Sequence, residues 1–163
     1  MDRSKLPYRK NCEGYFIDRN GNILAKLSKQ GFVVFPGGGI EENERVEDGM
    51  IRETLEETGV VIKRLRSLGV VSFIWGPEWA KTEKQKKRYE QFKGDEMHFF
   101  SGEVMNFVNQ ENKEEDSWNG NKFMPIDKVI ENVSVRLSAN KDDQHVFFQL
   151  KFLYIKYNHF SSL

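Results

Sequence analysis

Three glutamates that lie close together in the sequence could do metal chemistry. Glu53, Glu56 and Glu57 are three and four residues apart, so on an α-helix they share one face. Like charges at this spacing repel one another by roughly a few tenths of a kcal/mol. A hard divalent cation relieves that repulsion, because it prefers carboxylate oxygen as its ligand. The three residues alone are more typical of a solvated acidic helix face, so their neighbours must decide.

The residues around these glutamates match a longer signature, G-x5-E-x7-R-E-U-x-E-E-x-G-U, in which U is a bulky apolar residue. Its fixed positions and its last apolar position are filled by Gly38, Glu44, Arg52, Glu53, Glu56, Glu57, Gly59 and Val60. A chance match at the seven fixed positions has odds on the order of one in ten million per alignment. The chain therefore resembles the Nudix hydrolase family of MutT-like nucleoside diphosphate-linked-moiety pyrophosphohydrolases. The resemblance is strongest over residues 35–60.

The resemblance implies a metal-dependent pyrophosphohydrolase, in which water attacks a phosphorus of a diphosphate with Mg²⁺ or Mn²⁺ as cofactor. Such phosphoryl transfers need positioning and charge neutralisation, and divalent ions supply both. Carried over position by position, the expected metal ligands are Glu53, Glu56, Glu57 and the backbone carbonyl of Gly37. Glu53 is the first candidate for the general base. Arg52 would orient the glutamates, and Glu44 would support the loop–helix geometry or bind the metal indirectly.

Candidates outside the glutamate cluster complete the expected site. Some members of the family use a carboxylate beyond the signature, and Glu103 is the candidate here, with an ordinary exposed strand residue as the alternative. Gly38 and Gly39 are expected to approach the substrate. Lys26 could meet phosphates, although lone lysines are usually just solvated. Asn140 lies where some members recognise a purine, but a helix-cap role already explains it.

Two residues depart from the family's pattern. Thr54 stands where Leu, Ile or Val is usual, and its methyl group is expected to pack at a small cost in stability. Asn43 replaces a common Gly, and Asn tolerates the left-handed backbone conformation better than most residues. Gly49 inside the helix costs roughly 1 kcal/mol relative to Ala, which suggests close packing against a neighbour.

Substrate choice rests on weaker patterns. The three tryptophans are Trp75, Trp79 and Trp118; any of them could stack on a base, although aromatic side chains are more often core. Residues 82–93 combine basic and aromatic side chains, which suits a polyphosphate or an RNA end. A solvated loop is the simpler interpretation of that segment.

Three functions stay open on this basis. The first is hydrolysis of a nucleoside triphosphate, oxidised or otherwise damaged ones included, to a monophosphate and pyrophosphate. The second is the same chemistry on a dinucleoside polyphosphate, a nucleotide sugar, ADP-ribose or capped RNA. The third is a nucleotide- or RNA-binding module without turnover, and the complete set of glutamates speaks against it.

Hydrophobic spacing indicates the elements that position these residues. Residues 45–58 have the spacing of an amphipathic helix, which Gly59 is placed to end. Residues 32–35 form a short expected strand that ends at Pro36, and the three glycines that follow are not expected to continue it. Residues 77–94 are polar and poorly periodic, and are interpreted as a long basic loop.

The rest of the chain alternates strand and helix patterns. The expected elements are a hairpin over 12–28 that turns at Asn20-Gly21, strands within 60–75 and 96–108, a helix near 126–132, and a last helix over 141–158 capped by Asn140. This mixture indicates the α/β class. The resemblance implies a Nudix fold with a mixed β-sheet sandwiched between helices.

Composition sets the outer bounds. A chain of 163 residues is expected to form one domain over 1–163, with 1–10 as a flexible start. Twenty-five basic and 25 acidic residues cancel, which argues against a dedicated DNA-binding protein. No apolar run reaches membrane-spanning length, no signal peptide is visible, and a single cysteine indicates a reducing, cytoplasmic compartment. The expected partner is a diphosphate-containing small molecule, with nucleic acid limited to an RNA 5′ end, and the chain as a monomer or a homodimer.

Overall fold

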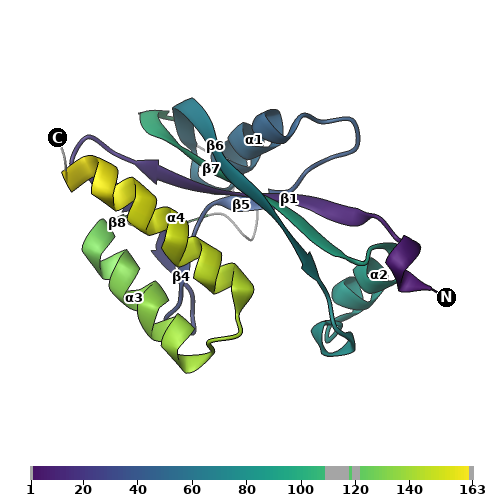
Figure 1. Cartoon of the computed structure of the whole chain (residues 1–163). Coiled ribbons are helices and arrows are strands. Elements are labelled where there is room, and N and C mark those ends of the chain that lie inside the picture. Colours follow the sequence, from purple (N-terminus) through teal and green to yellow (C-terminus); the bar gives the residue numbers. More distant parts are fainter. Residues whose placement is uncertain (1, 109–117, 119–121, 162–163) are drawn as a thin grey trace.

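The computed structural model describes residues 2–108, 118 and 122–161, and its centre is a six-stranded mixed sheet (Figure 1). The strand order is β6 (Val60–Ile74), β7 (Gly94–Phe107), β1 (Tyr8–Ile17), β2 (Asn22–Leu24) and β8 (Phe123–Pro125), with β5 (Gly37–Gly39) also paired to β1. β1 and β7 run parallel, and the other pairs run antiparallel. A separate two-stranded sheet joins β3 (Lys26–Leu27) to β4 (Val33–Val34).

Helices cover both faces of the sheet, as the α/β expectation requires. Helix α1 (Val46–Thr58) covers one face, and α3 (Ile126–Ala139) and α4 (Gln144–Ser161) cover the other (Figure 1). Successive side chains of a strand point to opposite faces. Accordingly Phe16 of β1 packs in the core beneath α1, whereas its neighbour Tyr15 packs in the core beneath α3 and α4. The sandwich of a mixed sheet between helices is confirmed.

The hairpin between β1 and β2 turns where the sequence predicts. The Asp18 carboxylate accepts hydrogen bonds from the backbone N–H groups of Asn20 and Asn22, at 2.8 and 2.9 Å. Gly21 supplies the positive φ of 79° that such a turn needs.

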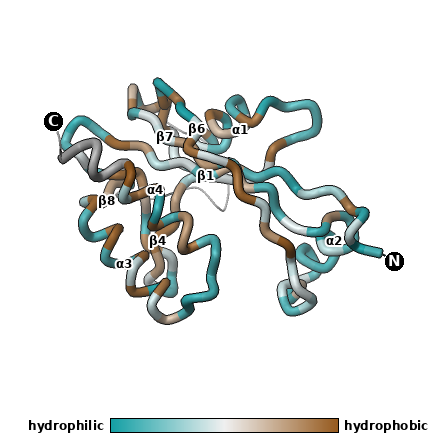
Figure 2. The backbone as a smooth tube through the Cα atoms, in the orientation of Figure 1, coloured by the Kyte–Doolittle hydropathy of each residue, from teal (hydrophilic) through white to brown (hydrophobic). Residues whose placement is uncertain are grey.

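The prediction of a long loop over 77–94 is wrong, because the middle of this segment is helical. The segment holds a short 3-10 helix, η2 (Pro77–Trp79), and a helix, α2 (Glu83–Gln91), before β7 begins. A capping box starts α2, because the Thr82 hydroxyl and the Gln85 side chain each bond the other's backbone N–H. α2 buries no residue and is hydrophilic in Figure 2, so no apolar stripe marks it in the sequence.

Three further boundaries differ from expectation. The glycines of β5 do form a strand, paired antiparallel with β1. α3 continues to Ala139, well past the expected end at residue 132. Asn140 ends α3 instead of capping α4, because its N–H donates to the Arg136 carbonyl; the carboxylate of Asp143 bonds the N–H of Val146 at the start of α4.

The first residues form regular structure against α2. A short 3-10 helix, η1 (Arg3–Lys5), precedes β1, and the Arg3 guanidinium lies over the Tyr89 ring at 3.3 Å from its centroid. None of the helices in the described part of the chain is both long enough and apolar enough to cross a membrane.

Candidate active site

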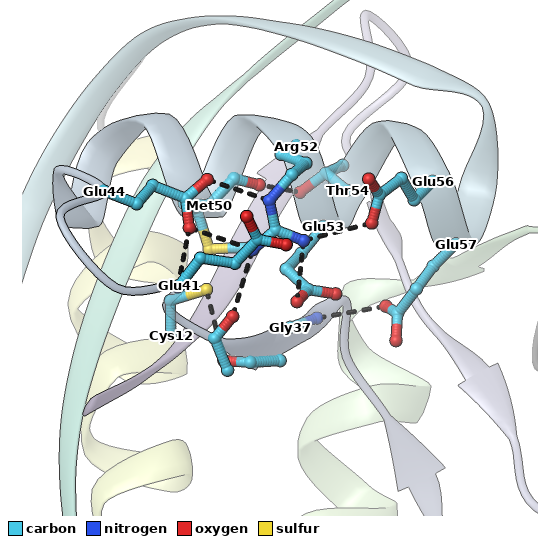
Figure 3. Close-up of polar contacts among 12 residues, drawn as sticks. Cys12, Gly37, Glu41, Glu44, Met50, Arg52, Glu53, Thr54, Glu56 and Glu57 are labelled. Carbon is cyan, nitrogen blue, oxygen red and sulfur yellow. Dashed lines mark hydrogen bonds and ion pairs between the residues drawn. The ribbon is translucent and has the colours of Figure 1, made fainter. Parts of the chain in front are cut away.

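Three glutamates of the signature, Glu44, Glu53 and Glu56, gather around one arginine on α1 (Figure 3). The Arg52 guanidinium donates two hydrogen bonds to Glu44, at 2.8 and 2.9 Å. It also reaches Glu53 at 3.1 Å and Glu56 at 3.0 Å. A further bond at 3.0 Å goes to the backbone carbonyl of Gly39. Arg52 therefore ties the carboxylates of α1 to the loop before it and to β5.

Local backbone features fix the position of this helix. Asn43 has a φ of 64°, the left-handed conformation expected of it, just before the helix begins. Gly59 has a φ of 70° and donates to the Leu55 carbonyl at 2.8 Å, which ends α1 as predicted. A Cβ at Gly49 would lie only 2.9 Å from a carboxylate oxygen of Glu44. The expected close packing at Gly49 is therefore confirmed, and it lets Glu44 reach Arg52.

Thr54 fits the apolar side of α1 without an unpaired polar atom. The side chain is fully buried, and its hydroxyl donates to the Met50 carbonyl at 2.7 Å. The same bond recurs one turn later, from Thr58 to the carbonyl of Thr54 at 2.6 Å. Burial of a hydroxyl costs little when it is hydrogen-bonded in this way.

The glycines of β5 make room for the carboxylates. A Cβ on Gly38 would lie within about 2.5 Å of both carboxylate oxygens of Glu53, so only glycine leaves that space. The Gly37 N–H donates to Glu57 at 3.1 Å (Figure 3), and the Gly38 carbonyl lies 3.6 Å from the thiol of Cys12. Glu53 and Glu57 thus lie directly against the backbone of β5.

The carboxyl groups of the cluster have pKa values that are shifted in different directions. Arg52, through its hydrogen bonds, lowers the pKa of Glu44 to about 2 and has its own pKa raised by the same partners. Burial raises the pKa of Glu53 despite its contact with Arg52. A partly buried carboxylate whose charge is this poorly stabilised gains from an additional cation.

The donor set suits a hard divalent cation, which takes carboxylate and carbonyl oxygens. Glu53, Glu56 and Glu57 supply such oxygens beside the cradle left by Gly38. Within the described ranges, no three His, Cys, Asp or Glu side chains already stand as a formed metal site. In this structure the guanidinium of Arg52 lies between the carboxylates of Glu53 and Glu56 and supplies positive charge to both.

Glu44 is expected to make stability depend on pH in the acid range. Its pKa of about 2 lies below the usual 4.5, so the ionised form stabilises the fold, and this contribution is lost as the pH falls through that window. A Glu44→Gln variant should melt about 3 °C below the wild type at pH 7. Scanning calorimetry should show this gap narrowing between pH 4.5 and pH 2.5; a constant gap would contradict the assignment.

The structure places Glu103 and Lys26 away from the carboxylates of α1. Glu103 pairs with Arg64 at 3.1 Å and with Lys63 at 3.9 Å, across the β6–β7 ladder. Lys26 lies over the ring of Trp118 at 5.0 Å from its centroid. Trp118 itself is buried, and its backbone N–H donates to the backbone carbonyl of Glu57 at 2.8 Å. Among the described residues, none of these has a contact with the Glu53 carboxylate.

A cleft of about 550 Å³ opens on the α4 face of the sheet, where β6 ends and β7 begins. Its walls include the rings of Trp75 and Trp79, which stack in parallel with centroids 3.7 Å apart. The Trp75 indole N–H donates to Asp95 at 2.9 Å, and Asn11 donates to the other oxygen of the same carboxylate. Burial raises the pKa of Asp95. From the sequence, the two tryptophans are candidates to stack on a base, with the core as the alternative, and Trp75 is indeed buried; nothing in the sequence marks Asp95.

An ion pair lies at this cleft, with a half-buried His145 in the lining and its partner Glu13 buried in β1. His145 at the start of α4 lies 3.0 Å from the buried carboxylate of Glu13 in β1. Glu13 also accepts from the Tyr15 hydroxyl at 2.6 Å and from Gln149 at 3.0 Å. Burial alone would lower the pKa of His145 and raise that of Glu13, but their attraction outweighs it and shifts both in the opposite direction. Sequence reasoning missed this pair, because its members lie 132 residues apart.

Comparison with proteins of known sequence gives partial matches. An 8-oxo-dGTP diphosphatase of Proteus vulgaris is 30% identical over 103 residues, which span 53% of this chain and 89% of that protein. An RNA pyrophosphohydrolase of Haemophilus influenzae is 42% identical over 64 residues, which are 39% of this chain and 33% of that protein. The chain therefore spans most of the first relative and only about a third of the second.

Solved structures and a family model agree on the fold. A NUDIX hydrolase from Nitrosomonas europaea superposes with a TM-score of 0.56 at 16% identity, covering 78% of each chain. A MutT protein from Bacillus halodurans gives a TM-score of 0.51 at 20% identity, covering 76% of this chain and 72% of that one. The NUDIX domain model matches residues 14–150. The chain therefore belongs to the NUDIX family, whose hydrolases act on phosphorus anhydrides.

Proposed function

We propose that the chain is a Mg²⁺- or Mn²⁺-dependent pyrophosphohydrolase that cleaves a nucleoside triphosphate to a monophosphate and pyrophosphate. The carboxylates of α1, packed against the glycines of β5, are the observation that carries this proposal. The likeness to an 8-oxo-dGTP diphosphatase over most of that protein's length supports a triphosphate substrate, oxidised purine nucleotides included.

The roles of the residues follow from their contacts. Glu53, Glu56, Glu57 and the Gly37 carbonyl would hold the ion, which when bound supplies charge neutralisation and a more acidic water. Glu53 is proposed as the general base, because its raised pKa lets a carboxylate accept the proton of the attacking water nearer neutral pH. Arg52 holds Glu53 and Glu56 in position from the same helix.

The aromatic cleft is proposed as the nucleobase pocket. Stacked indole rings offer a face to any base, and the side chains of Asp143 and His145 line the same cleft as polar groups that would orient it. Each carboxylate oxygen of Asp95 already accepts a hydrogen bond, one from Trp75 and one from Asn11. Its proposed role is therefore to hold the indole of Trp75 and not to contact the base.

A substrate screen tests the proposal directly. Purified protein with Mg²⁺ or Mn²⁺ is mixed with nucleoside triphosphates, oxidised dGTP, dinucleoside polyphosphates, ADP-ribose and capped RNA, and the products are identified. Metal-dependent release of monophosphate and pyrophosphate is expected. Turnover confined to the linked or capped compounds would replace the triphosphate with the second substrate class. Binding without any turnover would make the chain a nucleotide-binding module.

Removal of one cleft indole should weaken substrate binding. Trp79→Ala loses a stacking surface worth about 1–3 kcal/mol per base, so KM should rise about tenfold while kcat changes little. Trp79→Phe keeps an aromatic face and should recover most of the loss. Steady-state kinetics on the best substrate of the screen measures both variants. An unchanged KM for Trp79→Ala would remove the base from this cleft.

Compartment and assembly stay predictions. We propose that the chain works in the cytoplasm on small nucleotides, as a monomer or a homodimer. Light scattering would measure which of the two forms is present.

A further inference from the structure

β6 lies at one edge of the six-stranded sheet, where β7 is its partner among the described strands. An edge strand leaves a row of backbone N–H and C=O groups unpaired, and such a row is a template for a further strand. At the opposite edge, β8 has three residues and ends at Pro125, so it offers little to pair with. β6 has 15 residues and is therefore the edge that a partner can extend.

The second half of β6 lacks the features that usually protect an edge. Bulges and charged side chains keep other strands away. Every shift of register between β6 and β7 lies before Gly69. The charged residues of β6 also precede Gly69; they are Lys63, Arg64 and Arg66. From Gly69 to Ile74 the strand has no bulge, no charge and no proline, so this stretch can accept another strand.

The free backbone groups of this stretch belong to Val70, Ser72 and Ile74. The backbone N–H of Trp75 donates to the Lys93 carbonyl at 3.1 Å, which makes these two residues a hydrogen-bonded pair at the end of the β6–β7 ladder. Hydrogen-bonded and non-hydrogen-bonded pairs alternate along an antiparallel ladder, so the backbone groups of residues 70, 72 and 74 point away from β7. Val70 and Ile74 are 51% and 75% exposed, and Ser72 is exposed as well.

This stretch is complementary to a second copy of itself. In an antiparallel pair with a two-fold axis through Ser72, Val70 of each copy lies opposite Ile74 of the other, and Ser72 lies opposite Ser72. Each opposed pair then exchanges both backbone hydrogen bonds, and apolar and hydroxyl pairs of this kind stabilise neighbouring strands. On the other face Val71 lies opposite Phe73. The 25 basic and 25 acidic residues of the chain cancel, so two copies do not repel through net charge.

We propose that the chain forms a homodimer in which the stretch from Gly69 to Ile74 pairs antiparallel with the same stretch of a second copy. The sheets of the two copies then form one continuous sheet, with Ser72 on the two-fold axis. The pairing is short, so we expect a weak dimer with a Kd of about 10–100 µM. Phe73 and Ile74 also line the cleft, so the second copy's strand would border the cleft of the first.

Sedimentation velocity of the full chain over about 1–300 µM tests the proposal, because this range spans the expected Kd. The wild type should change from monomer to dimer as its concentration rises. Ser72→Lys places two like charges opposite each other on the axis, and its Kd should rise at least about tenfold. The side chain is exposed in the single copy, so the melting temperature should stay within about 2 °C of the wild type.

Ser67→Lys is the matched control. It makes the same change at another exposed serine of β6, outside the paired stretch, and its dimer Kd should stay within about twofold. Ser72→Pro is a second disrupting variant, because it removes the backbone N–H on the axis. Proline is tolerated on an edge strand where that N–H faces solvent, so this variant should fold and stay monomeric.

Each outcome bears on the pairing of β6 and not on the hydrolase, because the readout is the mass of the particle. A wild type that stays monomeric over the whole range overturns the proposal and leaves the edge to an extended segment of another protein. A dimer that persists in both Ser72→Lys and Ser72→Pro places the interface elsewhere and overturns it too. An equal loss in Ser67→Lys would do the same, since the effect would then follow from added charge alone.

Discussion

Replacement of Glu53 with Gln is expected to lower kcat by about 10³-fold, the range associated with loss of a general base. The change keeps the side chain's size and removes its charge, so it also weakens the hold on the metal. Because burial raises the pKa of Glu53, its ionised form destabilises the fold, and the variant should melt no lower than the wild type. Steady-state kinetics and scanning calorimetry measure the two effects separately.

Glu47→Gln is the control for this variant. Glu47 lies on the same helix and pairs only loosely with Arg45, at 3.8 Å, so its loss should leave kcat within about twofold. Hydrolysis that is unchanged by Glu53→Gln combined with Glu57→Gln would overturn the assignment of the site to α1.

Gly38→Ala should disable the site by steric means alone. The added Cβ would lie within about 2.5 Å of both Glu53 carboxylate oxygens, and the flexible side chain must swing away. A displacement of about 1 Å can cost on the order of 10²-fold in rate, so we expect kcat to fall by about that factor. The melting temperature should change little, because the end of a side chain moves and the backbone does not.

A double variant checks that the glycine acts through the glutamate. Once Glu53→Gln has removed the carboxylate's function, the further change Gly38→Ala should add almost nothing to the loss of kcat, since both act on one group. Multiplied losses in the double variant would mean that Gly38 serves the reaction by another route.

Much of the carboxylate site could be predicted because its information is local. The spacing of Glu53, Glu56 and Glu57 places them on one helix face, and Gly59 marks where that helix ends. Asn43 adopts the left-handed backbone that its residue type allows. Each of these properties depends on a few neighbouring residues, so the sequence displays it directly.

The elements that sequence reasoning missed depend on contacts between distant segments. The glycines of β5 form a strand because β1 lies beside them, with Cys12 opposite Gly38. α2 carries no apolar stripe and is held instead by Arg3 across the chain. Asn140 and Asp143 both look like helix caps, and only the observed end of α3 decides between them.

Successive side chains of β1 point to opposite faces of the sheet, so the number of residues between two of them decides whether they share a face. Cys12 belongs to the face that holds the carboxylates, whereas Arg9 and Glu13 belong to the face that holds the cleft. An insertion of one residue between Arg9 and Cys12 would send every preceding side chain to the wrong face. Two inserted residues would restore the faces but displace Arg9 by about 6.6 Å. A change of length in this stretch therefore disturbs both faces of the sheet at once, whereas a substitution disturbs only the face that its side chain reaches.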